Sequence, residues 1–422
     1  MSEASPSSSA GTRGARCRLC GHALAHVLVD LGMSPISNAY LSGGELSRME
    51  PFYPLRPLVC DRCWLVQLEE FETPEQIFGN DYAYFSSYSA SWLAHAERYT
   101  ELAIERFGLD ERSRVVELAS NDGYLLQFFV QQQIPVLGVE PAANVAAAAE
   151  ERGVPTAVDF FGAAAAETLA GDGLADLLIA NNVLAHVPDL NDFLAGMKAL
   201  LAPDGAITVE FPHLLRLLDE NQFDTIYHEH FSYFSFLTAC RAFERHGLRV
   251  FDVEELETHG GSLRVFACHD EGSAHERTGR VEDLIRRERE EKLDQLEPYL
   301  SFAERARKAK REILGFFVEQ RSAGARIAGY GAPAKGNTML NFCGIRSDFL
   351  EFTVDRNPHK QGRFLPGSHI PIRAPEAIAE ARPDFVYILA WNLKDEIMEQ
   401  ISYVRDWGGR FVTHTPSLQV HE

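Results

Sequence analysis

The sequence lacks three features, and each absence excludes a class of protein. No apolar run approaches the roughly 20 residues that a membrane-spanning helix needs. Positive charge is scarce, because 40 Lys and Arg stand against 61 Asp and Glu, and a net charge of −21 repels nucleic-acid phosphates. Residues 1–14 are rich in Ser, Ala and Gly without an apolar core, so we expect a disordered tail and no signal peptide. We therefore expect a cytoplasmic monomer with neither a membrane nor a nucleic-acid partner.

What the sequence contains is typical of a globular protein. Its 422 residues are 45% hydrophobic, 24% charged and 10% aromatic, which excludes disorder. A chain of this length is expected to form two or three domains, each with its own core.

Four of the seven cysteines form two close pairs, Cys17–Cys20 and Cys60–Cys63. Each pair has two residues between its thiols, and Gly21 permits the tight turn that directs both sulfurs to one metal ion. Disulfides are disfavoured in a reducing cytosol, and a redox motif needs only one pair. Four thiolates suit tetrahedral zinc, although the insert exceeds the usual spacing of about 15–20 residues. We predict a structural zinc module over residues 15–75.

Apolar segments alternate with helical ones between residues 76 and 272, which predicts a doubly wound parallel sheet. β-rich runs on both sides of Gly260 and Gly261 predict a closing hairpin. The expected strands are 114–118, 136–140, 154–158, 175–180 and 206–211.

A second α/β unit follows a charged connection. Residues 273–320 are dense in Arg, Glu and Lys with apolar residues interleaved, which indicates connecting helices. The alternation then resumes within 321–422 as a smaller Rossmann-like domain, so the fold class is α/β with a zinc module and two Rossmann-like sheets. Its expected strands are 326–331, 349–355, 385–389 and 410–413.

The turn from Glu117 to Gly123 lies between a strand and a helix, where an open sheet binds its ligands. Glu140 ends the next strand about 20 residues on, where a carboxylate binds two ribose hydroxyls. NAD and S-adenosylmethionine (SAM) both fit this pattern. The pyrophosphate fingerprint Gly-x-Gly-x-x-Gly is absent, and carboxylates suit a sulfonium cation, so SAM is favoured. The residues expected around it are Glu117, Ala119, Ser120, Asn121, Gly123, Glu140, Pro141, Asp159, Phe160 and Asn181.

Asp159 and Phe160 follow the third strand, where a carboxylate and a ring suit adenine; a loop Asp beside a core Phe is an equal alternative. Asn181 and His186 follow the fourth strand and are expected to point into the same crevice.

The segment Tyr227-His-Glu-His230 follows the last predicted parallel strand of the first sheet. It combines a general base, a carboxylate to orient that base and a phenol. A metal site is the alternative, because His and Glu are good ligands, but the helical His-Glu-x-x-His spacing of zinc hydrolases is absent.

Together these motifs resemble the SAM-dependent C-methyltransferases of antibiotic deoxysugar pathways, which act on TDP-linked 4-keto sugars. The resemblance covers nearly the whole chain beyond the tail. It implies a zinc-binding N-terminal module, a SAM-binding Rossmann domain and a C-terminal domain that helps to bind the nucleotide sugar. The segments that carry it are the cysteine pairs, 81–87, 117–123, 182–188, 227–231, 259–264 and 329–336.

The resemblance also implies roles for single residues. Ala119 departs from the family pattern, which has glycine there, and we expect its small methyl group to be tolerated. The matching positions are His230 for the catalytic base, Tyr227 and Glu229 beside it, His186 for a second histidine, and Tyr82 or Tyr84 for a tyrosine lining the pocket.

A nucleotide diphosphate needs cations, which an acidic protein must supply locally. Lys335 lies in a Gly-rich turn, with Asn337 as a helix cap or phosphate ligand. Lys360 and Arg363 are further candidates, with solvated surface charge as an equal alternative. His259 precedes two glycines that allow close approach to the sugar, although a plain hairpin turn explains them almost as well.

The leading hypothesis is methyl transfer from SAM to the carbon beside the ketone, C-3 of a TDP-4-keto-deoxysugar, after His230 removes a proton. The second hypothesis is an NAD-dependent nucleotide-sugar oxidoreductase or epimerase. The sequence has neither the pyrophosphate fingerprint nor the Tyr-x-x-x-Lys pair, and both absences argue against it. The third is a non-catalytic, zinc-stabilised binding protein.

Overall fold

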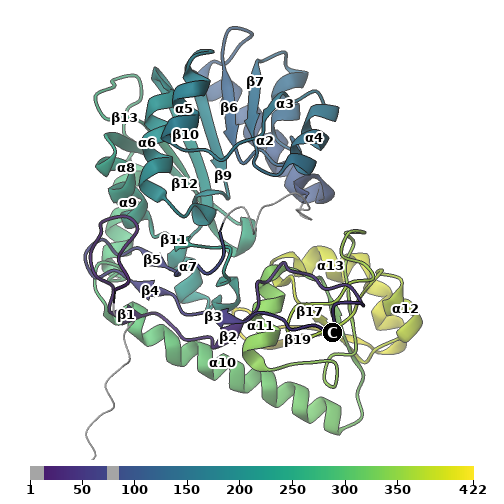
Figure 1. Cartoon of the computed structure of the whole chain (residues 1–422). Helices are drawn as coiled ribbons and strands as arrows, with labels where there is room; N and C mark the ends of the chain where they lie inside the picture. Colours follow the sequence, from purple (N-terminus) through teal and green to yellow (C-terminus); the bar gives the residue numbers. More distant parts are fainter. Residues whose placement is uncertain (1–13, 74–84) are drawn as a thin grey trace, which may run out of the picture.

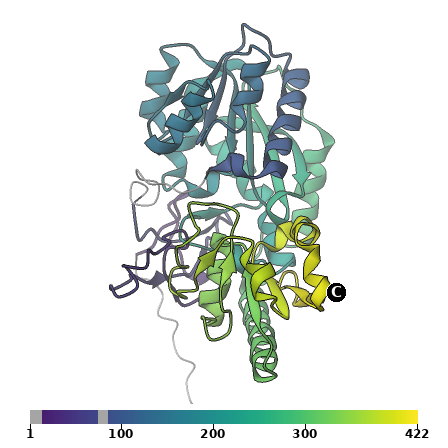
Figure 2. The same ribbon diagram turned by 90° about the vertical axis from the view of Figure 1, so that its right-hand side faces the viewer.

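The computed structural model describes residues 14–73 and 85–422, and it contains two mainly parallel sheets in separate lobes (Figure 1). The first lobe holds a seven-stranded sheet and the second a six-stranded sheet. Figures 1 and 2 show the same division from two sides, with the first sheet above and the second below. This arrangement confirms the predicted α/β class. Tyr82, Tyr84 and the predicted tail up to residue 13 lie outside the described residues.

The first sheet has the strand order β12-β13-β10-β9-β6-β7-β8. Strands β6 to β10 in this sheet run parallel, and β12 and β13 form the antiparallel hairpin expected at its edge. The bounds are β6 Val115–Leu118, β7 Val136–Val139, β8 Thr156–Ala157, β9 Ala175–Asn181, β10 Leu201–Pro212, β12 Leu248–Leu256 and β13 Ser262–His269.

Alternate residues of these strands bury opposite faces of the sheet. Val115 and Leu177 pack beneath α2 (Ala90–Phe107) and α3 (Leu126–Gln131). Val116 and Leu178 pack with residues of α6 and α8 in a second cluster. Because both faces are covered, most side chains of these strands are apolar. Glu210 and Arg264 are buried exceptions, and they pair with each other across β10 and β13. The other helices of this lobe are α4 Ala143–Glu151, α5 Ala163–Ala170, α6 Leu190–Leu200, α7 Leu214–Asp219 and α8 Phe236–Arg245.

The second sheet has the strand order β16-β15-β14-β17-β18-β19, and only β19 is antiparallel to its neighbour. The long helix α10 (Glu297–Ser322) leads into it and lies at the bottom of the molecule in both views. The remaining bounds are α9 Gly279–Glu290, β14 Ile327–Tyr330, α11 Ala334–Cys343, β15 Thr353–Val354, β16 Ile372–Arg373, α12 Ala377–Ala381, β17 Phe385–Ile388, α13 Lys394–Gln400, β18 Arg410–Thr413 and β19 Gln419–His421.

The N-terminal module forms a small sheet that borrows a strand from the first lobe. Its order is β1-β4-β5-β11, and β11 (Ser232–Tyr233) follows the Tyr227–His230 segment directly. The other short strands of the module are β1 His26–Val27, β2 Met33–Ser34, β3 Tyr53–Pro54, β4 Leu58–Val59 and β5 Val66–Gln67. The sequence did not predict this shared sheet. Within the described residues, no helix is both long and apolar enough to span a membrane.

The turn after β6 holds two non-glycine residues in the left-handed backbone region. Ala119 has a φ of 54° and Asn121 a φ of 50°. Asn tolerates this region, whereas Ala loses roughly 1–2 kcal/mol to the clash of its Cβ with the backbone. The small size of the Ala119 methyl group predicted that this residue would be tolerated. The relevant cost is backbone strain, which does not depend on the space around the methyl group.

We therefore expect Ala119→Gly to raise the free energy of unfolding by about 1 kcal/mol, because glycine adopts a positive φ freely. Ala147→Gly is the matched control, since Ala147 is exposed within α4 and the same change should cost about 1 kcal/mol there. Urea unfolding measures both. A loss of stability in both variants would contradict the assignment of strain to position 119.

Candidate active site

Three neighbouring strands of the first sheet end in polar residues at the same edge. β6 leads into the turn 119–123, β7 into Glu140, and β9 ends at Asn181. Because β6 pairs in parallel with both β7 and β9, these groups lie together at the carboxyl end of the sheet.

Glu140 is buried and binds the turn above it. Its carboxylate oxygens accept hydrogen bonds from the backbone N–H of Asn121 (3.0 Å) and of Ala142 (2.9 Å). Burial raises the pKa of Glu140 to about 7, although the two amides oppose this shift. The charge of this carboxylate is therefore sensitive to pH near neutrality.

Several buried polar atoms around Glu140 lack a partner among the described residues. Both side-chain polar atoms of Asn181 and of Asn182, Oε2 of Glu117 and Oγ of Ser120 belong to this group. Buried polar groups are rarely left unpaired in folded proteins, so their concentration here fits a polar cofactor such as SAM. Asn182 was not among the residues predicted around SAM, and its φ of 54° at a strand end marks it as unusual.

Other residues predicted around SAM have different surroundings. Phe160 is 40% exposed, and Asp159 beside it is also exposed. Both side chains are accessible to a ligand, and the adenine site expected for this pair stays a prediction. Gly123 has a φ of 74°, and a Cβ there would lie 3.0 Å from Val154, so packing also requires this glycine. Pro141 is half-buried beside Glu140.

His230 is buried and its hydrogen bonds determine its tautomer. Its Nδ1 lies 3.2 Å from the carbonyl oxygen of Thr225, which only accepts, so Nδ1 carries the proton. Its Nε2 therefore accepts the hydroxyl proton of Tyr227 at 2.7 Å. Burial lowers the pKa of His230 well below its usual range, and His186 adds to that effect. The ring is therefore neutral at pH 7, with its basic nitrogen directed toward Tyr227.

His186, in the 3-10 turn η2 (Leu184–His186), lies beside His230, with 4.7 Å between the ring centroids. Its Nδ1 donates to the carbonyl oxygen of Glu229 at 2.6 Å. Burial lowers the pKa of His186 to about 4, so this ring is also neutral at pH 7. Its Nε2 is consequently an acceptor and has no proton to donate.

Glu229 binds the N-terminal module and has no hydrogen bond to His230 among the described residues. Its Oε1 accepts from the backbone N–H (3.0 Å) and the Nδ2 (3.1 Å) of Asn38. Burial raises the pKa of Glu229. The expectation that Glu229 orients the base is therefore wrong, because the carbonyl of Thr225 does so. Sequence reasoning missed Asn38 and Thr225, since neither stands in a recognisable motif.

The second lobe contributes Lys335 from the first turn of α11. Its Nζ donates to Asn392 Oδ1 at 2.8 Å and lies 4.4 Å from the centre of the Trp391 ring. His259 approaches from the tip of the β12–β13 hairpin, and burial, reinforced by the positive charge of Lys335, lowers its pKa to about 4. The structure thus brings together His230, His186, Tyr227, His259 and Lys335.

Three further predicted substrate ligands differ in their surroundings. Lys360 donates to the carbonyl oxygen of Ala332 at 3.0 Å, and Arg363 is exposed. Asn337 is fully buried in α11, where its Oδ1 accepts from Asn341. The structure therefore gives Asn337 a packing environment instead of a position at the helix end.

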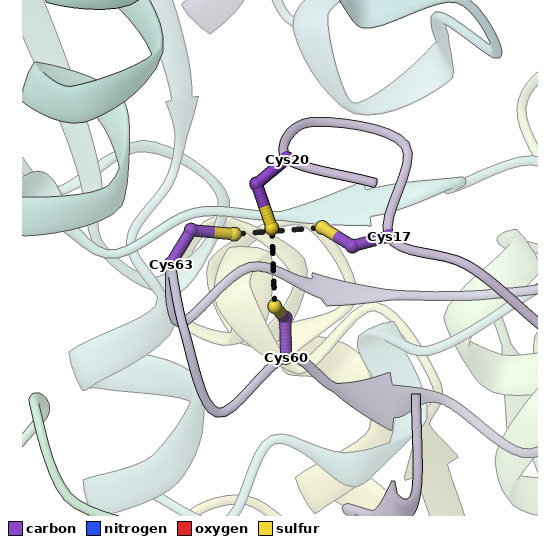
Figure 3. A group of neighbouring side chains, drawn as sticks. All are labelled: Cys17, Cys20, Cys60 and Cys63. Carbon is purple, nitrogen blue, oxygen red and sulfur yellow. Dashed lines mark hydrogen bonds between the residues drawn. The ribbon is translucent and has the colours of Figure 1, made fainter. Parts of the chain in front are cut away.

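The four paired cysteines converge at one point, as Figure 3 shows. Their sulfur atoms all lie within 4.8 Å of one another. Two tight turns direct them there, because Gly21 N–H bonds the carbonyl of Cys17 and Trp64 N–H bonds that of Cys60. This donor set fits a closed tetrahedral zinc site, which is structural because all four positions come from the protein.

Comparison with known proteins agrees with this site. The chain is 41% identical over 408 residues to the C-methyltransferase NovU of Streptomyces niveus. This alignment covers 96% of each of the two chains. The chain belongs to the C-methyltransferase family. Family models match "Putative zinc binding domain" at residues 17–78, "Methyltransferase domain" at 92–253 and "C-methyltransferase C-terminal domain" at 257–416. The protein is thus a SAM-dependent C-methyltransferase with a zinc-binding module, and not an NAD-dependent enzyme or a non-catalytic scaffold.

Solved structures resemble only part of the chain. Magnesium protoporphyrin IX methyltransferase of Synechocystis, with bound SAH, is 13% identical and covers 46% of this chain and 92% of its own, with a TM-score of 0.35. The glycopeptide N-methyltransferase MtfA is 14% identical and covers 41% and 95%, with a TM-score of 0.33. The family assignment rests on the sequence relative alone.

We expect SAM binding to weaken as the pH falls through 7, because Glu140 loses its charge there. Between pH 8 and pH 6 the ionised fraction of a group with this pKa falls about tenfold. Titration calorimetry of the wild type should show a comparable loss of affinity. Glu140→Gln, which is neutral at every pH, should bind SAM weakly and without that dependence. The same pH dependence in both proteins would rule out Glu140 as its source.

Purified protein should contain one zinc ion per chain by mass spectrometry. Cys60→Ser removes one of four ligands and should abolish zinc retention and lower the melting temperature. Methyl transfer should also fall, because the module packs against Glu229 through Asn38. Cys343→Ser changes a buried cysteine of the second lobe and should keep its zinc. Zinc loss in both variants, or in neither, would argue against the four-cysteine site.

Proposed function

We propose that the substrate is a TDP-linked 4-keto-deoxysugar, methylated at the carbon beside the ketone, C-3. The resemblance of the motifs to deoxysugar C-methyltransferases supports this substrate. The observation that carries the mechanism is the tautomer of His230, a neutral ring whose Nε2 holds no proton. A carbon beside a ketone is acidic enough for such a base, and a positioned base contributes about 10²–10⁴ in rate.

In this mechanism the sugar takes the place of the Tyr227 hydroxyl at Nε2 of His230. The C–H bond breaks, the proton moves to Nε2, and the electron pair spreads over the carbon and the ketone oxygen as an enolate. The released hydroxyl of Tyr227 donates a hydrogen bond to that oxygen. His186 does not take this role, because its single proton is already bonded to the carbonyl of Glu229.

Glu117, Glu140, Asn181 and Asn182 are the residues we propose to hold SAM. Glu117, Asn181 and Asn182 have side-chain polar atoms without a partner among the described residues. Glu140 is buried, and its bonds to two backbone amides shape the turn beside them. Bound SAM supplies an electrophilic methyl group on a sulfonium, so that a new carbon–carbon bond forms as the carbon–sulfur bond breaks. The enzyme then has to return the proton from His230 to solvent. The main contribution of the enzyme is to hold the sugar carbon at contact distance from the methyl group and in line with the carbon–sulfur bond.

Cations for the nucleotide sugar come from Lys335, with Lys360 and Arg363 as further candidates at a greater distance from the histidine cluster. Lys360 already donates to the carbonyl of Ala332, so it is less available for a phosphate. Tyr82 and Tyr84 stay predictions, because they lie outside the described residues.

The test is incubation of the wild type with a TDP-4-keto-deoxysugar and SAM, followed by mass spectrometry. We expect a gain of one methyl group on carbon. In D₂O without SAM, the wild type should exchange the hydrogen beside the ketone for deuterium, and His230→Ala should not, because the base is lost.

His275→Ala is the control for this experiment, since His275 Nε2 lies 3.2 Å from the carbonyl oxygen of Asp204, near the start of β10 and so at the opposite end of the sheet from the candidate site, and the variant should exchange like the wild type. Equal exchange in the wild type and His230→Ala would reject His230 as the base. Methylation of an oxygen atom, or no methylation, would reject the substrate class.

A further inference from the structure

Trp391 joins the second lobe to the segment that carries His230. Its indole N–H donates to Asp224 Oδ2 at 2.7 Å. Asp224 is fully buried in the turn η3 (Phe223–Thr225), and the same oxygen lies 2.9 Å from His414 Nε2. Because Thr225 also holds His230, the catalytic histidine and the indole are fixed by adjacent residues of one turn.

The hairpin tip that carries His259 packs against the same indole. A Cβ on Gly260 would lie 2.4 Å from the Trp391 ring, so this glycine allows a contact that any side chain would block. The helix α11 adds a second tie, since Thr338 Oγ1 donates to the carbonyl of Ile226 at 3.0 Å. Lys335 is one turn before Thr338 in α11, and its positive charge acts on both His230 and His259.

The ammonium group of Lys335 is held on two sides. The Trp391 ring lies beneath it at 4.4 Å, and Asn392 Oδ1 accepts one of its protons at 2.8 Å. An ammonium has three N–H donors, and Asn392 accepts only one of them, so donors remain for a ligand. The carboxylate of Asp224 behind the indole N–H increases the electron density of the ring and so strengthens its attraction for the cation.

We propose that Lys335 donates a hydrogen bond to the ketone oxygen of the sugar, and that Trp391 and Asp224 are positioning residues that hold it there. This inference rests on the proposed function and departs from it at one residue: Lys335 binds the ketone oxygen as the second donor beside Tyr227, and the diphosphate is left to Lys360 and Arg363. When the C–H bond breaks and its electron pair moves to the oxygen, Lys335 shares a proton with that oxygen without losing it. A lysine that bound only the diphosphate would have no need of a place beside the catalytic turn.

The electrostatic surroundings agree with this role. Burial lowers the pKa of Lys335 to about 8, while the negative charge of Asp224 opposes that shift. The titratable groups that face it are Asp224, His230 and His259, and both histidines have lowered pKa values and are neutral at pH 7. The cation is therefore retained at pH 7 but lost in mildly alkaline solution.

The experiment compares Lys335→Met and Trp391→Phe with two controls from the same lobe. Lys394→Met removes an exposed lysine at the start of α13, and Trp407→Phe removes an indole N–H that bonds only the carbonyl of Pro383. For each variant, the kcat and KM of methyl transfer to a TDP-4-keto-deoxysugar are measured with deuterium exchange in the absence of SAM.

We expect Lys335→Met to lower kcat and the exchange rate about 10²-fold, the effect of losing one oxyanion donor, with KM changed less than about threefold. Trp391→Phe should lower both rates about tenfold and move the alkaline limb of the kcat profile to lower pH, because Asp224 no longer acts through the ring. Neither control should change. The pH shift separates positioning from general destabilisation, which melting temperatures also monitor.

A raised KM for the nucleotide sugar with an unchanged kcat in Lys335→Met would overturn the inference and assign Lys335 to the diphosphate. An unshifted pH limb in Trp391→Phe would overturn the positioning role. If the wild type itself fails to methylate the sugar, the proposed function fails instead, so the two failures are distinguishable.

Discussion

The pairing of β5 with β11 is the interaction on which the active site depends. Ser232 pairs with Gln67 and Tyr233 with Val66, so the backbone that follows His230 completes the sheet of the zinc module. Gln67 also donates from its side chain to Cys17 Sγ at 3.2 Å. The metal ligands and His230, the proposed base, are therefore connected through one short strand, and the module is part of the framework of the candidate site.

This connection allows polar groups to be buried at low cost. The segment from Tyr227 to His230 carries two imidazoles and a carboxylate into the interior, where each unpaired polar group costs about 1–3 kcal/mol. The N-terminal module pairs most of them, because Asn38 binds Glu229 and the carbonyl of Pro54 lies 3.2 Å from His228 Nε2. Burial then lowers the pKa of His230, so the scaffold that positions the base also keeps it unprotonated.

Much of the architecture was predictable from the sequence, because it depends on local patterns. A few consecutive residues are enough to recognise each of these features: the apolar strands, the turn after Leu118, the cysteine pairs and the Tyr227–His230 segment. The confirmed elements include the β12–β13 hairpin and the second α/β sheet.

The partners of the site residues were not predictable, because they come from distant segments of the chain. Asn38 is 191 residues from Glu229, and Trp391 is 167 residues from Asp224. Nothing in either local sequence marks these pairs. The wrong role for Glu229 arose because sequence proximity suggested a bond to His230, whereas the backbone of Thr225 supplies it.

The shared sheet also bears on how the chain matures during synthesis. The cysteines are complete once residue 63 has been made, but the fourth strand of their sheet ends at residue 233. Domains generally fold from the N-terminus as they leave the ribosome. In this enzyme the sheet of the first module stays unfinished until more than half of the polypeptide has emerged, so the assembly of the candidate catalytic centre is a late event in its biogenesis.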